Sequence, residues 1–203
     1  PEWISLPSHR TLPGPMDIKT PSVSDSLASP VSFFKIKTAD GVTMDVWMKK
    51  PVPFDSSKKY PVLFEVYTEP GSQTVLDYYG IGGNPLYQGD LSKDGYIYIS
   101  VDNRGTPAPK GADWRNSIYR KIGRLNIHDQ AMAAREIMKW PFVDSSRIAV
   151  WGWSGGGSAA LNLMFQYPDI YKTGIAVAAL CNLLTYDNIY EERYMGIPQE
   201  AYD

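Results

Sequence analysis

One serine stands in a sequence context that can make it a nucleophile. The stretch Gly152-Trp153-Ser154-Gly155-Gly156 matches G-x-S-x-G. In that pattern a serine occupies a sharp turn between a strand and a helix, and the helix N-terminus faces the negative charge that develops during acyl transfer. Residues 147–151 are apolar enough for the strand, and residues 158–165 for the helix. A glycine-rich turn with an incidental serine is the alternative, but the flanking elements favour a nucleophile.

A serine nucleophile also needs hydrogen-bond donors for the oxyanion of its tetrahedral intermediate. The backbone N–H of Gly155 is the first expected donor. The second should come from the loop that follows the third strand, which we predict at residues 62–67. Tyr67 ends that strand and could direct its phenol toward the site. On the pattern alone, a tyrosine at a strand end is more often a packing residue.

The sequence lacks the acid and base in the places where this chemistry needs them. With a G-x-S-x-G turn, the partners follow the serine in the order Asp and then His. The only histidines are His9 and His128, and both precede Ser154. His128 and Asp129 are not a dyad, because adjacent residues of a helix do not face each other. We therefore expect the N-terminal part of a catalytic domain, truncated before its Asp and His and nearly inactive by itself.

The elements around Ser154 predict an α/β fold. Residues 31–38 and 42–49 alternate apolar and polar side chains around Asp40-Gly41, which is typical of a hairpin. Denser apolar runs are typical of parallel strands buried on both faces, and helical periodicity separates these runs. The runs cover 62–67, 96–101, 148–152 and 174–179, and the helices cover 126–140 and 154–167.

The first thirty residues differ from the rest. Six prolines and many serines make long regular elements unfavourable there. We expect an irregular lead over 1–30, with at most one short strand at 2–6, and a catalytic domain over 31–203.

Composition excludes several classes of function. The chain has 203 residues, with 20 basic and 22 acidic side chains, so charge gives no reason to expect nucleic-acid binding. No apolar run is long enough to span a membrane. The single cysteine, Cys181, excludes an internal disulfide. No metal-ligand spacing, phosphate loop or dinucleotide motif is present, so we expect neither a metal nor a cofactor.

Four stretches resemble the dipeptidyl peptidase IV-like serine peptidases of the prolyl oligopeptidase family. They are EVYTEPGSQ at 65–73, VDNRGT at 101–106, GWSGGG at 152–157 and YDNIYEERYMG at 186–196. The tyrosine-rich last stretch is the most specific. The resemblance implies an α/β-hydrolase fold, with a mostly parallel sheet, helices on both faces and an N-terminal hairpin.

The resemblance also implies roles for individual residues. Ser154 is the acylated nucleophile, and the Tyr67 hydroxyl and the Gly155 amide form the oxyanion hole. Tyr186 and Tyr190 line an S1 pocket for proline, although their spacing also suits one face of an amphipathic helix. Gly155 replaces a tyrosine found in many members. Leu180 and Leu183 occupy pocket positions that often hold a valine and an aromatic residue.

The family further implies partners. A β-propeller would precede this chain, its last strand near residues 2–6, and the rest of the catalytic domain would follow. The substrate would be a peptide, and a homodimer is possible in this family. The resemblance favours a periplasmic or secreted protein and leaves a cytoplasmic one open. Two other functions stay open: an esterase or acylaminoacyl-type hydrolase on the same fold, and a non-catalytic interaction module. Release of dipeptides has no support in this sequence.

Overall fold

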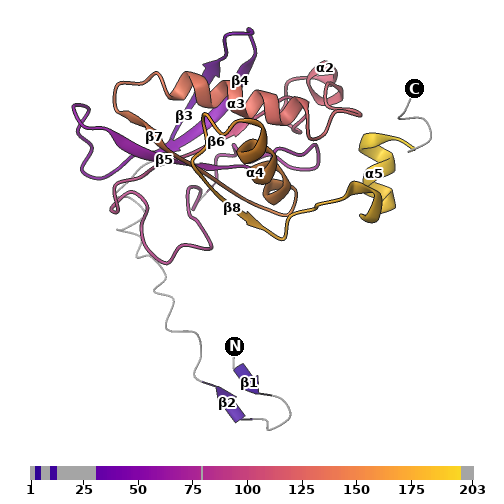
Figure 1. Cartoon of the computed structure of the whole chain (residues 1–203), viewed down its shortest axis with the longest axis horizontal. Coiled ribbons are helices and arrows are strands. Elements are labelled where there is room, and N and C mark those ends of the chain that lie inside the picture. Colours follow the sequence, from indigo (N-terminus) through magenta and orange to yellow (C-terminus); the bar gives the residue numbers. More distant parts are fainter. Residues whose placement is uncertain (1–2, 6–9, 13–30, 79, 198–203) are drawn as a thin grey trace.

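A six-stranded mixed sheet forms the centre of the molecule (Figure 1). The computed structural model describes residues 3–5, 10–12, 31–78 and 80–197. The strand order is β3-β4-β6-β5-β7-β8; β3, β4 and β6 pair antiparallel, and β6, β5, β7 and β8 pair parallel. The strands are β3 (Val31–Lys37), β4 (Thr43–Lys49), β5 (Tyr60–Glu65), β6 (Ile97–Asp102), β7 (Val143–Trp153) and β8 (Thr173–Val177).

The helices follow the parallel strands, as an α/β fold requires. The two long ones, α3 and α4, follow β6 and β7, and they contact each other. The predicted α/β fold with its mostly parallel sheet is confirmed. The described helices are α2 (Ala112–Asn116), α3 (Leu125–Ile137), α4 (Gly155–Gln166), the 3-10 helix η1 (Leu183–Thr185) and α5 (Asn188–Met195).

The antiparallel hairpin lies where its sequence pattern predicts it. β3 and β4 pair along their whole length, with Lys37 opposite Thr43 next to the turn and Val31 opposite Lys49 at the far end. The turn between them contains Gly41 at φ 87°, a conformation that glycine adopts without strain. This hairpin extends the parallel part of the sheet away from Ser154.

The two faces of the sheet carry cores of different size. Alternate residues of a strand point to opposite faces, and the two clusters follow that rule. Phe64 and Val150 belong to the larger cluster, which includes apolar side chains of α3 and α4. Trp151 and Tyr98 point to the other face, into a smaller cluster that also contains Trp47 and Leu91. The helices therefore fix the positions of β5 and β7, the two strands that lead to the candidate site.

Helix α3 starts one residue before residue 126, where the sequence pattern predicts its start. The helix begins at Leu125, with Arg124 at the N-cap and no side-chain cap. Asn126 is a buried residue of the first turn, and its Oδ1 accepts a hydrogen bond of 2.8 Å from the Gly123 amide. The Asn126 side chain therefore accepts from a backbone N–H just before the helix, and its amide also reaches the loop at Thr68.

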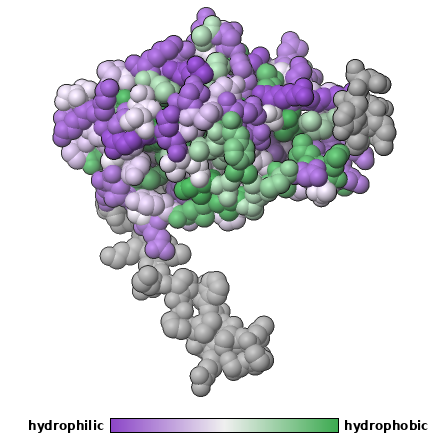
Figure 2. All heavy atoms as spheres, viewed as in Figure 1, coloured by the Kyte–Doolittle hydropathy of each residue, from purple (hydrophilic) through white to green (hydrophobic). Residues whose placement is uncertain are grey.

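Strand β8 is an exposed edge of the sheet. Its residues are largely accessible, and Ile175 is 53% exposed. Figure 2 shows apolar side chains gathered over this part of the molecule, around β8 and α4. Such an edge presents unpaired backbone groups to any neighbouring chain.

Little of the lead segment lies among the described residues. Strand β1 (Trp3–Ser5) pairs antiparallel with β2 (Arg10–Leu12), so the short strand expected within 2–6 is present and has a partner that the sequence did not predict. The remainder of 1–30 lies outside the described residues, and its assignment to a separate unit stays a prediction. Among the described residues, no helix has the length and apolar character of a membrane span, and no cluster of potential metal ligands occurs.

Candidate active site

Ser154 occupies a strained turn between β7 and α4. Its backbone is at φ 58° and ψ −120°, which is unusual for a residue with a side chain. The Ser154 amide donates to the carbonyl of Val177 on β8 (2.8 Å), and its carbonyl accepts from the Ser158 amide in the helix (3.1 Å). The residue is half-exposed, and no described residue donates to or accepts from its hydroxyl. The turn thus holds a free hydroxyl above the end of the sheet.

Glycines around Ser154 let three pieces of backbone meet. A Cβ on Gly152 would overlap the Gly156 carbonyl, and a Cβ on Gly156 would overlap the Val66 carbonyl. A Cβ on Gly157 would lie 2.7 Å from the Val177 carbonyl. Only glycine fits such approaches, so β5, β8 and the first turn of α4 converge on the serine. The N–H groups of that first turn, Gly155 included, have no partner within the helix.

Tyr67 lies beside the same turn. Strand β5 ends at Glu65, two residues earlier than predicted, although the Val66 amide still bonds the Trp151 carbonyl (3.0 Å). A Cβ on Gly156 would come within 3.2 Å of the Tyr67 Cα, which places this tyrosine against the helix start. Burial, followed by the nearby Glu69 and Tyr186, raises the pKa of Tyr67. The phenol therefore keeps its proton and is a hydrogen-bond donor at neutral pH.

A buried network of amides holds the loop that carries Tyr67. Thr68 has a left-handed backbone, at φ 73°. The Asn103 side chain donates to the Thr68 carbonyl (3.0 Å), and the Asn126 side chain donates to the Thr68 hydroxyl (2.9 Å). Gln130 adds a bond of 3.1 Å to Asn103. Strain of about 1–3 kcal/mol at Thr68 is sustained because these buried groups determine its conformation.

The tyrosines predicted to bind substrate come together on the chain that follows β8. The Tyr186 and Tyr190 rings are 5.9 Å apart in an edge-to-face arrangement, and Tyr194 lies 4.8 Å beyond Tyr190. Tyr190 is on α5, whose N-cap Asp187 accepts from the Ile189 amide (2.8 Å). Burial, followed by the hydrogen bond to Glu69, raises the pKa of Tyr190, and the nearby Tyr67 acts in the same direction. Tyr67, Tyr186 and Tyr190 therefore share one neighbourhood.

The two leucines predicted at the pocket occupy the link between β8 and these tyrosines. Leu180 is tied to α4, because the Ser158 hydroxyl accepts from its amide and donates to its carbonyl, both at 2.8 Å. Leu183 begins η1, whose N-cap Asn182 accepts from the Leu184 amide (3.0 Å). Both leucines are half-exposed. Their contact with a substrate side chain stays a prediction.

Glu69 is a residue of this site that sequence reasoning missed. It is 5% exposed and accepts a hydrogen bond from the Tyr190 hydroxyl. Burial raises the pKa of Glu69, and the bond from Tyr190 acts in the opposite direction. A glutamate two residues after a buried strand reads as a surface loop residue, and nothing in its spacing links it to α5. Only the three-dimensional fold joins residues that far apart in the chain.

The remaining polar candidates near the site have structural roles. Asp129 is buried and accepts from Arg104 through Nε (3.0 Å) and Nη2 (2.6 Å). His128 Nδ1 lies 3.6 Å from Asp129 Oδ1 and 3.9 Å from Asp40 Oδ2. Asp129 is thus committed to Arg104, which fits our rejection of a His128–Asp129 dyad. Cys181 is exposed.

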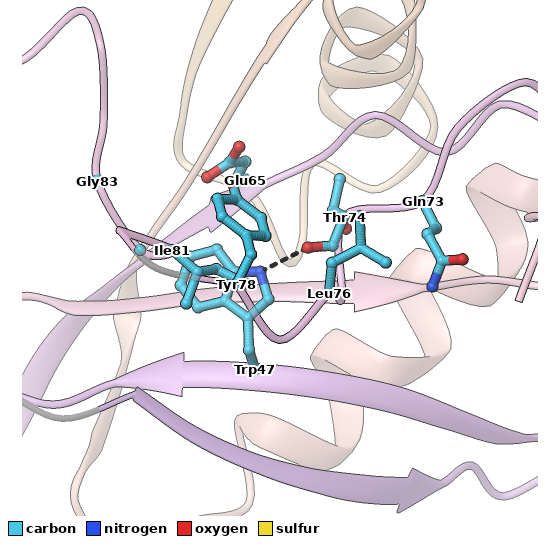
Figure 3. A pocket seen from close by; sticks show the side chains of 9 residues that line it. Trp47, Glu65, Gln73, Thr74, Leu76, Tyr78, Ile81 and Gly83 are labelled. Atoms are coloured by element: carbon cyan, nitrogen blue, oxygen red, sulfur yellow. Dashed lines mark hydrogen bonds between the residues drawn. The ribbon is translucent and has the colours of Figure 1, made fainter.

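Two hollows lie outside this cluster. One of about 160 Å³ is on the face of the small core, where the Trp47 indole donates to the Thr74 carbonyl (3.1 Å; Figure 3). Glu65, which also lines this hollow, accepts a hydrogen bond from Tyr98. None of the predicted site residues lines it. Another, of about 490 Å³, is bounded by Pro70 and by Tyr194 on α5. It adjoins the tyrosine cluster through Tyr194, whose ring packs on Tyr190.

Comparison with known proteins decides the family. A sequence profile of the prolyl oligopeptidase family matches residues 88–203, which include the Ser154 turn and the tyrosine segment. The chain belongs to this family. The fold agrees, because the crystal structure of Porphyromonas gingivalis dipeptidyl peptidase 4 matches 96% of the chain with a TM-score of 0.79 and 36% sequence identity. That match covers 27% of the crystallised protein.

The chain is also similar to curated proteins with peptidase descriptions. A Trichophyton verrucosum protein described as a "probable dipeptidyl-aminopeptidase B" is 38% identical over 182 residues, which are 89% of this chain and 20% of that protein. Mouse prolyl endopeptidase FAP is 39% identical over 158 residues, 78% of this chain and 20% of its own length. The chain therefore spans about a fifth of the length of these relatives.

Proposed function

We propose that this chain carries the nucleophile and oxyanion hole of a serine peptidase that cleaves after proline-like P1 residues. The observation that carries the proposal is Ser154 at a positive φ, in a turn whose neighbours must be glycine, with a hydroxyl that no described residue engages. Ser154 would attack the scissile carbonyl and form an acyl-enzyme, which water then hydrolyses.

The oxyanion would be stabilised by two donors that meet at the turn. The Gly155 amide stands at the N-terminus of α4, where the helix dipole favours negative charge. The Tyr67 phenol is protonated at neutral pH, and the Tyr67 backbone lies against the same turn. Preorganised donors of this kind each contribute on the order of 10²–10³ in rate.

The P1 side chain would be bound between Tyr186 and Tyr190. Proline offers a compact apolar ring without an N–H, so aromatic walls can bury it with no unsatisfied donor. The acid and base that activate Ser154 would come from the longer polypeptide, as expected from relatives in which the matching stretch is only 20% of the length. By itself, the chain is expected to be inactive or nearly so.

Substrate turnover by the full-length polypeptide tests this function. We expect hydrolysis of Gly-Pro amides at neutral pH, with matched Gly-Leu amides cleaved at least about tenfold less efficiently. The Ser154→Ala variant is the control for contaminating peptidases. Turnover of short acyl esters without any cleavage of Gly-Pro amides would instead support the esterase function.

A further inference from the structure

Gly155 differs from the other glycines of the nucleophile turn in what it faces. Side chains at Gly152, Gly156 and Gly157 would meet backbone carbonyls. A side chain at Gly155 would instead overlap the carboxyl group of Glu69. The space next to the nucleophile is therefore filled from the β5 loop, by the side chain at position 69.

The same carboxyl group holds an aromatic wall of the site. Glu69 is almost fully buried and accepts a hydrogen bond from the Tyr190 hydroxyl. Tyr190 in turn packs between Tyr186 and Tyr194. A hydrogen bond to a charged acceptor is stronger than one between neutral groups, and burial protects it from water. Glu69 thus connects the turn at Ser154 with α5.

We propose that Glu69 determines P1 specificity, by limiting the depth of the P1 pocket beside Gly155 and by positioning Tyr190 as its wall. This inference rests on the proposed function, in which Tyr186 and Tyr190 receive the P1 residue. Compact residues such as proline and alanine fit a pocket limited in this way, and branched or aromatic P1 residues are excluded. Glu69 is a positioning residue, because it acts on substrate through Tyr190 and through the volume that it occupies.

Two substitutions separate volume from hydrogen bonding. Glu69→Ala removes both, whereas Glu69→Gln keeps the size and an amide oxygen that can accept from Tyr190. For a proline P1, Glu69→Ala should raise KM about tenfold with a smaller change in kcat, as expected for the loss of one buried hydrogen bond and its packing. The preference for leucine over proline should rise about tenfold or more in the same variant. For Glu69→Gln, the KM for a proline P1 and the preference for leucine over proline should both stay within about threefold of the parent.

A double substitution tests the shared space directly. Gly155→Ala should disturb the turn, because its methyl group meets the Glu69 carboxyl, and Glu69→Ala should relieve that overlap. We expect the melting temperature of Glu69→Ala/Gly155→Ala to exceed the value obtained by adding the two single effects. Full-length protein is used for every measurement, and fluorophosphonate labelling of Ser154 is recorded for each variant.

The outcomes distinguish this inference from the proposed function. An unlabelled parent protein would reject Ser154 as the nucleophile. The melting temperatures of the single and double variants would then still test whether Glu69 fills the space beside Gly155. With a labelled parent, equal KM values and equal P1 preference for Glu69→Ala and the parent would overturn the specificity role. Additive melting temperatures would overturn the claim that Glu69 occupies the space of a side chain at 155.

Discussion

The two walls of the candidate site are supported in different ways. The first wall, residues 66–69 and the Ser154 turn, is held by backbone contacts that only glycine allows and by the buried amides of Asn103 and Asn126. The second wall, residues 180–195, has large apolar side chains in solvent, among them Leu184 (69% exposed) and Ile189 (80% exposed). It is joined to the first wall by Glu69 and Tyr190 and by the Ser158 hydroxyl.

This difference in support suits the two walls to different tasks: the first to oxyanion stabilisation and the second to binding of the P1 side chain. Oxyanion donors must be fixed before the reaction, because reorganising them costs rate. A P1 pocket needs only to close around a side chain, and much of its support can come from neighbouring chain segments. The first wall is therefore preformed by the residues described here, and the second depends on a few side-chain bonds.

The largest effect should follow a change at the centre of the first wall. Ser154→Ala should lower kcat of the full-length polypeptide on the order of 10⁴-fold or more, because the hydroxyl that accepts the acyl group in the proposed mechanism is lost. Ser154→Gly should be as inactive but more stable than the parent by about 1 kcal/mol, since glycine adopts φ 58° without strain. Steady-state kinetics and denaturant unfolding give the two values. A destabilised Ser154→Gly variant would contradict the strained turn.

The next largest effect should follow a side chain added at a glycine of the Ser154 turn. Gly156→Ala should destabilise the protein by about 3 kcal/mol, because its methyl group meets the Val66 carbonyl and backbone cannot move aside. Gly83→Ala is the matched control, since its Cβ would lie 3.6 Å from the nearest atom, an ordinary contact. Equal unfolding free energies for the two variants would show that the first wall is not as tightly packed as we describe.

The buried amides provide an intermediate effect. Asn126→Ala removes the bonds to Thr68 and Gly123, so we expect a loss of about 1–3 kcal/mol in unfolding free energy. The value of kcat should fall about tenfold, because Thr68 fixes Tyr67. Asn162→Ala, on the half-exposed side of α4, is the control and should change both values little. Loss of stability without loss of kcat would separate the network from catalysis.

The smallest effect is expected in the second wall. Tyr190→Phe keeps the ring contacts and removes the hydroxyl that Glu69 accepts. KM for a proline P1 should rise about fivefold, with kcat nearly unchanged. Tyr194→Phe keeps the ring that packs on Tyr190 and serves as the control with unchanged KM. A large fall in kcat for Tyr190→Phe would show that the walls are not separable.

The sequence predicts the first wall better than the second. The strand, turn and helix around Ser154 follow from local periodicity and glycine spacing, and β3, β4, β6 and α4 lie within two residues of their predicted bounds. Strand β5 ends at Glu65, two residues before its predicted end, and α3 ends at Ile137, three residues before its predicted end. Glu69 could not be found from sequence, since its partner Tyr190 is distant in the chain and the space it fills exists only after folding.

Labelling of the full-length polypeptide with a fluorophosphonate, followed by peptide mapping, tests the central claim most directly. We predict one adduct, on Ser154, that disappears in Ser154→Ala and is blocked by a peptide with proline at P1. An adduct on another residue with Ser154 unmodified would contradict the account.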